Sequence, residues 1–439
     1  MIDAVVLVFA VYNYFMTYST YLSPSLEVLP LGASSLNMIV SGLALVYVAR
    51  RVAGVSGARA GDRRGTLLLL LILLLTTVAS TANLISLRAG AQPEEYIHDH
   101  PLQIEAGLDF LTDGENPYTR DYTDTPVALW HGWTTNPAIQ HFISLPSTLY
   151  LALPLYVSWE GFFGWYDHRI LSLLALGLAL WCVHRLLERA DYRAIAFLAI
   201  GLNPFFTPHF IHGIEDIVFL SMLLLALLLL TRQQVLASVI VMALTVTSKQ
   251  TAVFVLPFYV LHLYQVGALA RQPGRIVFAF AGIVLLALAP FLLWDAASFY
   301  ADVYAYPAGT LATSYPIKGF GLSLYLVQQG IIPGADVYFP FWILQAIFLG
   351  PLFFVLLRAQ LRRPGLGQML LNYGMFLWGF WFFSRFFNDS YIGVLTVIFT
   401  LGGLLTIQER GAQGGSTPST FETQTASMAN KSASSDSSA

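Results

Sequence analysis

The chain has 439 residues, of which 56% are hydrophobic and only 11% are charged. This composition excludes an ordinary soluble globular domain and indicates a protein whose natural solvent is lipid. The formal net charge of -3 says little about partners, and we expect no nucleic acid among them.

Long apolar stretches dominate the sequence and lack the alternation of outer-membrane strands. Because a helix satisfies its backbone groups internally, we expect an all-α transmembrane bundle of about 12 spans. The stretches lie at residues 2–22, 34–49, 66–87, 170–187, 194–207, 213–231, 234–247, 250–266, 275–294, 337–357, 368–384 and 388–407. The first has Asp3 near its start and no small-residue cleavage pattern, so we expect it to remain as an anchor. The single cysteine, Cys182, is expected to be a small apolar filler.

Arginine clusters in the connections set the orientation, because Lys and Arg are enriched in short cytoplasmic loops. Alternation from the first cluster places all of the later ones on the same side. The clusters are Arg50, Arg51, Arg59, Arg63 and Arg64, then Arg185, Arg189 and Arg193, then Arg232, then Arg271 and Arg275, then Arg358, Arg362 and Arg363. This agreement requires residues 139–163 to lie along or dip into the outer face, which Pro146 and Pro154 favour. If that segment crosses, the orientation of everything after it changes.

This orientation leaves two long outer loops, residues 88–145 and 295–336, and long ordered loops commonly carry function. We divide the chain into two N-terminal spans with a basic cytoplasmic loop (1–65), a membrane core (66–407) and a disordered cytoplasmic tail rich in Ser, Thr, Gly and Ala (408–439). We expect a plasma-membrane protein whose chemistry takes place on the non-cytoplasmic side.

The first outer loop holds nine of the 25 acidic residues and four of the nine histidines, together with Trp130 and Trp133. Asp99 stands two positions before Pro101, where an acidic side chain can cap a helix whose first turn tolerates proline. Gly114 is expected to end that helix. The sequence therefore predicts one short helix at the outer surface, whose apolar side carries Ile104, Leu108 and Leu111.

The acidic residues of this helix allow different interpretations. Glu105, Asp109 and Asp113 are spaced four apart and are most simply a solvated stripe. Asp99 is either a helix cap or a general base that takes the proton of an acceptor hydroxyl during glycosyl transfer. His98, Asp99 and His100 could instead hold a metal together with Glu105 or His212, but alternating histidines are a weak signal, and we expect no metal and no cofactor.

Three segments resemble one family in order along the chain. A membrane exit, Asp99, a short helix and then Gly114-Glu-Asn-Pro-Tyr118 resemble the first outer loop of the C-type (GT-C) glycosyltransferases, especially the polyprenyl-phosphate-mannose-dependent mannosyltransferases. Leu202-Asn-Pro-Phe-Phe-Thr-Pro-His-Phe-Ile-His-Gly-Ile-Glu-Asp216 resembles the family's Asn-Pro and His-Gly-x-x-Asp segment. Ser248-Lys249-Gln250, followed by Pro257, resembles its Thr-Lys and downstream Pro signature. The resemblance covers about residues 66–407 and implies that Asp99 is the catalytic base.

Four basic residues fall at the outer boundary against the positive-inside bias: Arg169, Lys249, Lys318 and Arg385. A lipid phosphate donor needs such cations to neutralise the leaving group. Alternatively, Arg169 and Lys318 reach lipid headgroups, and Arg385 pairs with Asp389. His212, Glu215 and Asp216 could likewise form a structural polar cluster at a helix start.

These observations predict a transferase that moves a sugar, mannose by resemblance, from an undecaprenyl- or dolichyl-type phosphate to a glycolipid, a lipid-linked oligosaccharide or a glycan. Asp99 deprotonates the acceptor, Lys249 and Arg385 hold the phosphate, and the configuration inverts. The loop 295–336, with Tyr304, Tyr306, Tyr315 and Lys318, covers the site. The residues expected to bind substrate are His98, His100, Glu105, Asn116, Tyr118, Arg169, His212, Glu215, Asp216, Lys249, Gln250, Lys318 and Arg385.

Two rival functions remain at this point. A transporter or flippase of lipid-linked sugars would place its ionisable residues along a pathway near the membrane midplane. A noncatalytic subunit of glycan assembly would use the acidic, aromatic loop for contact only. The sequence has no nucleotide-binding glycine loop, so a soluble nucleotide donor is not indicated.

Overall fold

The computed structural model describes residues 1–18, 33–54, 62–130 and 136–414. Residues 19–22 of the first apolar stretch, Arg59, Trp133 and residues 415–439 of the expected tail lie outside these ranges. The elements are α1 (Ile2–Tyr18), α2 (Ala33–Val52), α3 (Arg63–Leu73), η1 (Leu74–Val78), α4 (Ala79–Ala89), α5 (Asp99–Thr112), η2 (Pro117–Thr119), α6 (Pro126–Leu129), η3 (Pro137–Ile139), α7 (Pro146–Phe163), α8 (Arg169–Leu186), α9 (Ala190–Gly201), α10 (Thr207–Ile211), α11 (Asp216–Thr231), α12 (Val235–Val246), η4 (Gln250–Val255), α13 (Leu256–Gln265), α14 (Ala268–Arg271), α15 (Pro273–Tyr300), η5 (Ala301–Ala305), α16 (Tyr306–Ala308), β1 (Lys318–Gly319), α17 (Leu322–Gln328), α18 (Phe341–Arg362), α19 (Leu366–Phe382), β2 (Phe386–Phe387) and α20 (Asp389–Gly414).

The predicted apolar stretches and the observed helices coincide. Each of the twelve stretches contains a helix, and six helices of the described residues are long and apolar enough to cross a membrane. Three shorter apolar helices accompany them. The all-α fold is therefore confirmed, and its long apolar helices fit a membrane protein, whereas the number of about 12 spans stays a prediction.

The bundle is built around α11, which packs against α8 and α12. Its sequence is apolar on every side, and most of its residues are buried, as expected for a helix surrounded by others. Helix α12 in turn contacts α15, and α19 packs along α20. Cys182 is fully buried on α8, consistent with its expected role as a filler.

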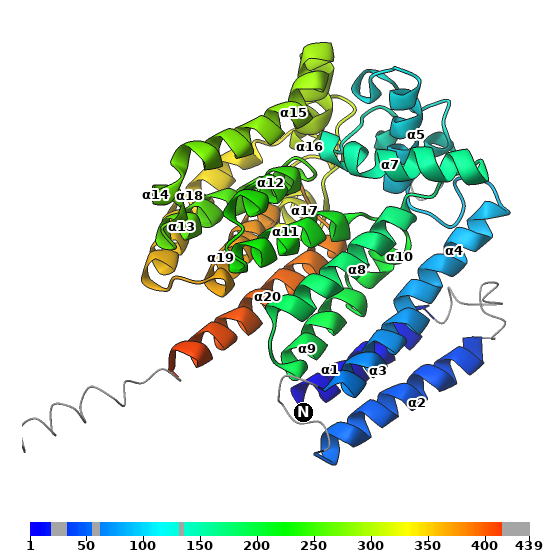
Figure 1. The fold of residues 1–439 in the computed structure, drawn as a ribbon. Helices are drawn as coiled ribbons and strands as arrows, with labels where there is room; N and C mark the ends of the chain where they lie inside the picture. The colour runs from blue at the N-terminus through cyan, green and yellow to red at the C-terminus, as the bar shows by residue number, and fades with distance from the viewer. Residues whose placement is uncertain (19–32, 55–61, 131–135, 415–439) are drawn as a thin grey trace, which may run out of the picture.

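Helix α7 differs from the others in direction. Figure 1 shows it crossing the upper ends of α4 and α8 instead of running beside them. The Ser147 backbone N–H donates to the Thr247 carbonyl at 3.1 Å, which ties the start of α7 to the end of α12. This arrangement favours the interpretation that residues 139–163 lie along the outer face.

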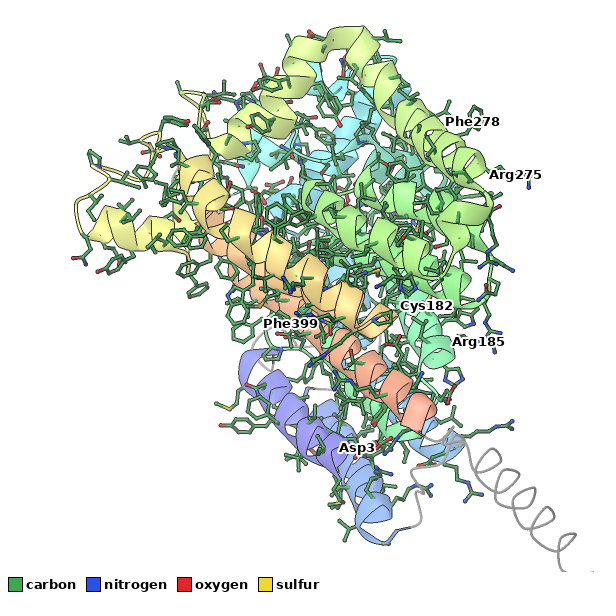
Figure 2. The ribbon with its side chains drawn as sticks, turned by 90° about the vertical axis from the view of Figure 1, so that its left-hand side faces the viewer. Asp3, Cys182, Arg185, Arg275, Phe278 and Phe399 are labelled. Carbon is green, nitrogen blue, oxygen red and sulfur yellow. The ribbon has the colours of Figure 1, made fainter. Side chains whose placement is uncertain are left out.

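A second core lies beneath the first outer loop. Buried residues of α5 and α7 pack there with Phe291 and Phe299 of α15. Helix α15 bends at Asp295, whose backbone is not helical (φ -158°, ψ 95°), and Figure 2 shows the chain turning back over the bundle. The Asp295 carboxylate accepts from the Ser298 N–H at 3.0 Å and so begins a new helical segment. The start of the expected loop 295–336 is therefore helical.

The two N-terminal helices are joined by a buried ion pair. Asp3 near the start of α1 lies 2.7 Å from the Arg51 guanidinium at the end of α2, and the Tyr47 hydroxyl donates to the same carboxylate at 2.6 Å. At the other terminus, α20 continues to Gly414 and so extends past residue 408, where the tail was expected to begin.

Candidate active site

A cavity of about 560 Å³ opens beside the first turn of α5. Its volume lies in the range of small-molecule sites, roughly 300–1,000 Å³. Polar and aromatic side chains from five separate segments line it: His98, Asp99, His100, Gln103, His141, His209, Tyr306, Tyr315, Lys318, Phe320, Phe386, Asn388, Asp389, Ser390 and Tyr391. We call it the Asp99 cavity.

Asp99 is the first residue of α5, and the prediction that it caps the helix is wrong. The N-cap residue is His98, which also contacts the Asp99 carboxylate through Nδ1. The His100 N–H also approaches this Nδ1 atom, at 3.4 Å. One ring nitrogen cannot both donate and accept a hydrogen bond, so we assign the Nδ1 proton to the bond with Asp99 and regard the His100 contact as weak. Burial raises the pKa of Asp99, but the hydrogen bond and charge of His98 outweigh it, and the net pKa is lowered. The carboxylate is therefore ionised at neutral pH.

The turn that carries Asp99 is held from two sides. The His98 N–H donates to the His212 carbonyl at 2.9 Å, and the Trp130 indole donates to the Ile97 carbonyl at 2.9 Å. Gly213 has a φ of +98°, and a Cβ there would meet Pro101 at 2.9 Å. Its lack of a side chain allows α5 to begin close to this backbone. His212 therefore contributes a carbonyl group that positions the Asp99 turn, and its side chain does not line the cavity.

Lys318 reaches the same cavity through a short parallel bridge. Strand β1 pairs with β2, with Lys318 opposite Phe386 and Gly319 opposite Phe387. Gly319 has a φ of +96°, and a side chain there would collide with the Phe387 carbonyl oxygen. Burial lowers the pKa of Lys318, whereas the charges of Asp389 and Asp99 act in the opposite direction. The Lys318 ammonium group therefore interacts electrostatically with the Asp99 carboxylate.

A histidine and a carboxylate face the cavity from a second direction. The His209 Nε2 lies 3.1 Å from the Asp389 carboxylate, so the alternative that Asp389 pairs with Arg385 is wrong. Arg385 is buried, and its guanidinium donates to the carbonyl groups of Tyr315, Val337 and Ala335, the last two at 2.9 and 3.0 Å. It holds the loop that carries Lys318 and does not line the cavity.

A third polar pair joins His141, which lines the cavity, to Asp302 behind it. The His141 Nδ1 lies 2.7 Å from the Asp302 carboxylate, whose other oxygen accepts from the Phe142 N–H at 2.9 Å. The second ring nitrogen of His141 contacts the Thr313 hydroxyl at 2.7 Å. The ring also lies against Tyr306 with centroids 4.6 Å apart. Of the tyrosines expected to cover the site, Tyr306 and Tyr315 line the cavity, whereas Tyr304 is exposed and stacks on Tyr300 outside it.

Two predicted binding residues instead belong to a buried ion network. Arg88 binds both Glu105 oxygens, at 3.0 and 2.6 Å, and contacts Asp167 at 2.9 Å. Arg169 in turn binds both oxygens of Asp167, at 2.9 and 2.7 Å. Two cations and two carboxylates thus join the end of α4 and the start of α8 to the middle of α5. Of the expected solvated stripe, Asp113 is exposed, Asp109 is exposed but accepts from the Tyr156 hydroxyl at 2.6 Å, and Glu105 is bound by Arg88, so the prediction is wrong for Glu105.

A second buried cluster holds further predicted residues. Glu215 lies 3.2 Å from the His168 Nε2 and 3.8 Å from the His100 Nε2, and Asp216 lies 2.5 Å from the Lys249 ammonium. Glu215, Asp216 and Lys249 do not line the Asp99 cavity. The geometry therefore favours the structural polar cluster over direct substrate binding for these residues.

The remaining predicted residues stabilise the loop. Gln250 donates to the Ile143 carbonyl at 2.6 Å, and the Asn116 side chain accepts from the Tyr118 N–H at 3.1 Å. The buried Tyr118 donates to the Ser144 carbonyl at 2.7 Å. Of the predicted residues, the structure thus brings Asp99, His98, His100 and Lys318 together. Burial, opposed by the Glu215 charge, lowers the pKa of His100, so its ring is neutral at pH 7.

The sequence interpretation missed His141, His209 and Asp389 as cavity residues. His209 stands in the segment quoted for the resemblance, and Asp389 begins the last apolar stretch, so polar residues at the ends of apolar runs were the available signal. Within the described ranges, no three His, Cys, Asp or Glu side chains are grouped as metal ligands, and the Glu105 suggested for such a set is bound to Arg88.

The family model of an alpha-(1->6)-mannopyranosyltransferase N-terminal domain matches residues 149–265. This match supports a C-type mannosyltransferase. It covers 117 of 439 residues, just over a quarter of the chain, and includes α8 to α13 but not the loop that carries Asp99. No curated protein and no solved structure matches the chain. The match thus supports a glycosyltransferase that uses a sugar donor and a glycan acceptor, and the long apolar helices fit a membrane protein.

Proposed function

We propose that this mannosyltransferase-like protein transfers mannose from a polyprenyl-phosphate donor to a hydroxyl group of a lipid-linked or glycan acceptor, within the Asp99 cavity. The observation that carries the proposal is the placement of an ionised carboxylate, Asp99, and a cation, Lys318, in one cavity at the end of an apolar bundle. A general base and a charge that balances a phosphate are what this transfer needs.

In the proposed reaction, Asp99 takes the proton of the acceptor hydroxyl as the oxygen forms a bond to the anomeric carbon. The bond between that carbon and the phosphate oxygen breaks, and the phosphate leaves with the electron pair. His98 orients the base through its contact with the Asp99 carboxylate. A single displacement inverts the anomeric configuration, so the α linkage in the name of the matching family requires a β-linked donor.

The structure changes which cation we assign to the donor phosphate. Lys249 and Arg385 were expected to hold it, but Lys249 is paired with Asp216 and Arg385 is bound by backbone carbonyl groups. Lys318 lines the cavity and therefore takes this role in the proposal. The aromatic rings of Tyr306, Tyr315 and Tyr391 provide apolar faces against which a sugar ring can pack.

We place this cavity on the non-cytoplasmic side. The described arginines of the connections lie at helix ends remote from Asp99, such as Arg185 at the end of α8 and Arg362 at the end of α18. The positive-inside rule assigns those ends to the cytoplasm. The lipid donor would then enter from the outer leaflet.

The test is transfer of radiolabelled mannose from a polyprenyl-phosphate donor by the purified protein in proteoliposomes. We expect the Asp99→Asn variant to lose about 10²- to 10⁴-fold in rate, the usual contribution of a general base. The matched control is Asp113→Asn, which removes an exposed carboxylate at the C-terminal end of the same helix and should keep the wild-type rate.

A correctly folded Asp99→Asn protein with full activity would contradict the assignment of the base. Transfer of another sugar but not of mannose would contradict the donor assignment. Counterflow of the lipid-linked sugar without any product would support a transporter instead.

A further inference from the structure

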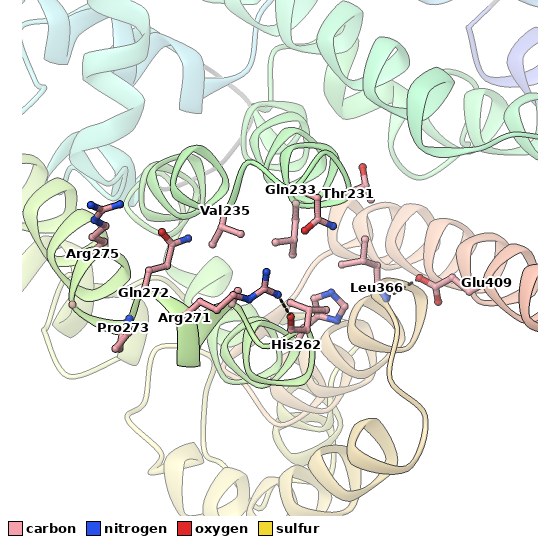
Figure 3. Close-up of a pocket in the computed structure, with 14 residues that line it drawn as sticks. Thr231, Gln233, Val235, His262, Arg271, Gln272, Pro273, Arg275, Leu366 and Glu409 are labelled. Atoms are coloured by element: carbon pink, nitrogen blue, oxygen red, sulfur yellow. Dashed lines mark hydrogen bonds between the residues drawn. The ribbon is translucent and has the colours of Figure 1, made fainter.

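A second, larger cavity lies towards the C-terminal end of α20, the helix whose first turn lines the Asp99 cavity. Its volume is about 980 Å³, and its walls come from the ends of α11 and α13, from α14 and from the starts of α12, α15 and α19 (Figure 3). Helix α20 fixes its position, because Asp389 lines the Asp99 cavity and Glu409 lines this one. Twenty residues at about 1.5 Å each separate the two by about 30 Å, the thickness of the hydrocarbon core. We call it the Arg271 cavity.

Two arginines give this cavity a positive charge. The Arg271 guanidinium donates to the carbonyl groups of Gly267 and Val266, at 3.1 and 2.6 Å, which holds it at the cavity rim. Arg275 lies in the first turn of α15, where the helix dipole already places positive charge. A cation at that position does not stabilise the helix, whereas an anion bound between the two arginines would offset both charges.

The one carboxylate among the described lining residues does not cancel this charge. Glu409 accepts a hydrogen bond from the Leu366 N–H at 2.8 Å and so caps the start of α19 (Figure 3). The helix N-terminus therefore stabilises the Glu409 carboxylate and holds it at the start of α19, and one carboxylate offsets only one of the two arginines. The arginines keep a net positive potential on the opposite side of the cavity.

A largely buried imidazole lies in the wall of this cavity. His262 is only 7% exposed, lines the cavity, and has an Nδ1 atom with no hydrogen-bond partner among the described residues. Figure 3 shows the ring between the Arg271 side chain and Leu366. Buried polar atoms are normally paired, so this closed-off, unpaired nitrogen shows that the fold does not satisfy the ring on its inner side. The nearby Gln233 and Gln272 amides supply further donors.

The cavity is also bordered by an apolar outer surface. Leu230, Val235 and Val266 contribute to its wall, and Phe278, one turn after the start of α15, is 81% exposed. Figure 2 shows Arg275 and Phe278 together on the outside of the bundle. A charged site beside a lipid-facing helix suits an amphipathic ligand, with its head between the arginines and its chain along α15.

We infer that the Arg271 cavity binds the phosphate group of a membrane lipid, at the membrane face opposite to the Asp99 cavity. The positive-inside rule alone predicts arginines at this face. It requires neither a cavity of this size nor a buried imidazole without a partner. Phosphate is an anion whose oxygen atoms can accept hydrogen bonds from the Arg275 guanidinium and from the Arg271 donors that the Gly267 and Val266 carbonyl groups do not occupy.

Calorimetric titration of the full chain in a nonionic detergent tests this site, with dihexanoyl phosphatidic acid as the lipid probe and inorganic phosphate as the free ion. We expect the lipid probe to bind and the R271Q/R275Q variant to lose at least tenfold in affinity. The matched control is R362Q/R363Q, which removes two arginines at the end of α18 that do not line the cavity. It should change affinity by less than twofold.

Two further variants keep the test decisive. His262→Leu changes no arginine and should weaken binding at least threefold, and R271K/R275K keeps the charge but loses the forked donors, so it should give an intermediate loss. An equal loss in R362Q/R363Q, or no binding of either probe to the wild type, would overturn the site. Binding of inorganic phosphate as tight as that of the lipid probe would overturn the lipid assignment and leave a site for the free ion.

Discussion

Asp99 and Glu105 lie six residues apart on the same helix, yet their surroundings differ completely. Both oxygens of Glu105 are bound by Arg88, whereas Asp99 contacts one histidine and faces a cavity. A charged residue in an apolar sequence therefore predicts a polar region of the bundle, but it does not show whether that residue stabilises the fold or binds a ligand. The partners of each group decide whether it stabilises the fold or remains available to a ligand.

The cations also differ in how deeply they are buried. Arg169 is fully buried against Asp167, while Lys318 is exposed to the cavity. The two were equivalent at the level of sequence, since both stand at the outer boundary. We therefore expect substitutions of buried, ion-paired residues to lower stability, and substitutions of residues beside the cavity to lower activity.

Removing the central cation of the network should give the largest effect on stability. We expect Arg88→Met to lower the free energy of unfolding by about 3–5 kcal/mol, because it leaves Glu105 and Asp167 buried with less compensation. Denaturant unfolding in detergent measures this loss. The control Arg120→Met breaks the exposed pair with Glu115 and should cost less than about 1 kcal/mol. Equal losses of unfolding free energy in the two variants would show that the buried network stabilises the fold no more than an exposed ion pair does.

The network should also make the free energy of unfolding depend on pH in the acidic range. Burial raises the pKa of Asp167, but Arg169 and Arg88 outweigh this effect and lower it to about 2. Because the pKa in the unfolded chain is about 3.9, the stabilisation is complete above pH 4 and is lost as the pH falls from about 4 towards 2. Its size is about 2–3 kcal/mol. Unfolding free energies of the wild type and Asp167→Asn should therefore converge on acidification; a constant difference would contradict the pairing.

Lys318 and Lys249 should respond in opposite ways to the same substitution. Lys318→Met should lower kcat/KM for the lipid-phosphate donor by about 10- to 100-fold, the value of a hydrogen bond to a charged group, and leave stability unchanged. Lys249→Met should destabilise the fold, because it leaves the buried Asp216 unpaired. Transfer kinetics and thermal unfolding of both variants provide the comparison. A Lys249→Met protein that is stable but inactive would indicate that Lys249, and not Lys318, binds the donor phosphate.

The contact between His141 and Thr313 should give the smallest effect. Thr313→Val removes one exposed hydroxyl group, worth about 1 kcal/mol, and should raise KM by about fivefold with little change in kcat. Initial rates at varied acceptor concentration measure the change. A loss of kcat of the size expected for Asp99→Asn would show that this wall takes part in the chemistry.

Much of the fold could be predicted because its signals are local. Each of the twelve apolar stretches contains a helix, because a long run of apolar residues can be recognised from neighbouring positions in the sequence alone. Helix α5 begins near Asp99 and ends before Gly114, whose φ of +79° is a conformation that glycine favours. The cap was assigned one residue too late, because Asp99 turns towards His98 and the cavity.

The cavity itself could be predicted only in part, because it depends on contacts between distant segments. His141 and Asp302 are 161 residues apart, and His209 meets Asp389 from a different helix. Arg385 provides the clearest example: its partners are backbone carbonyl groups, which every residue carries and no side-chain pattern reveals.

The bridge between β1 and β2 has a mechanical consequence. It closes a ring of chain that contains α17, α18 and α19, since a parallel pair must be joined by a long crossover. The Phe320 N–H bond to the Phe387 carbonyl, at 2.8 Å, fastens this ring next to Lys318. Any outward movement of this loop therefore either tilts α18 and α19 together with it or first breaks the hydrogen bonds of the bridge.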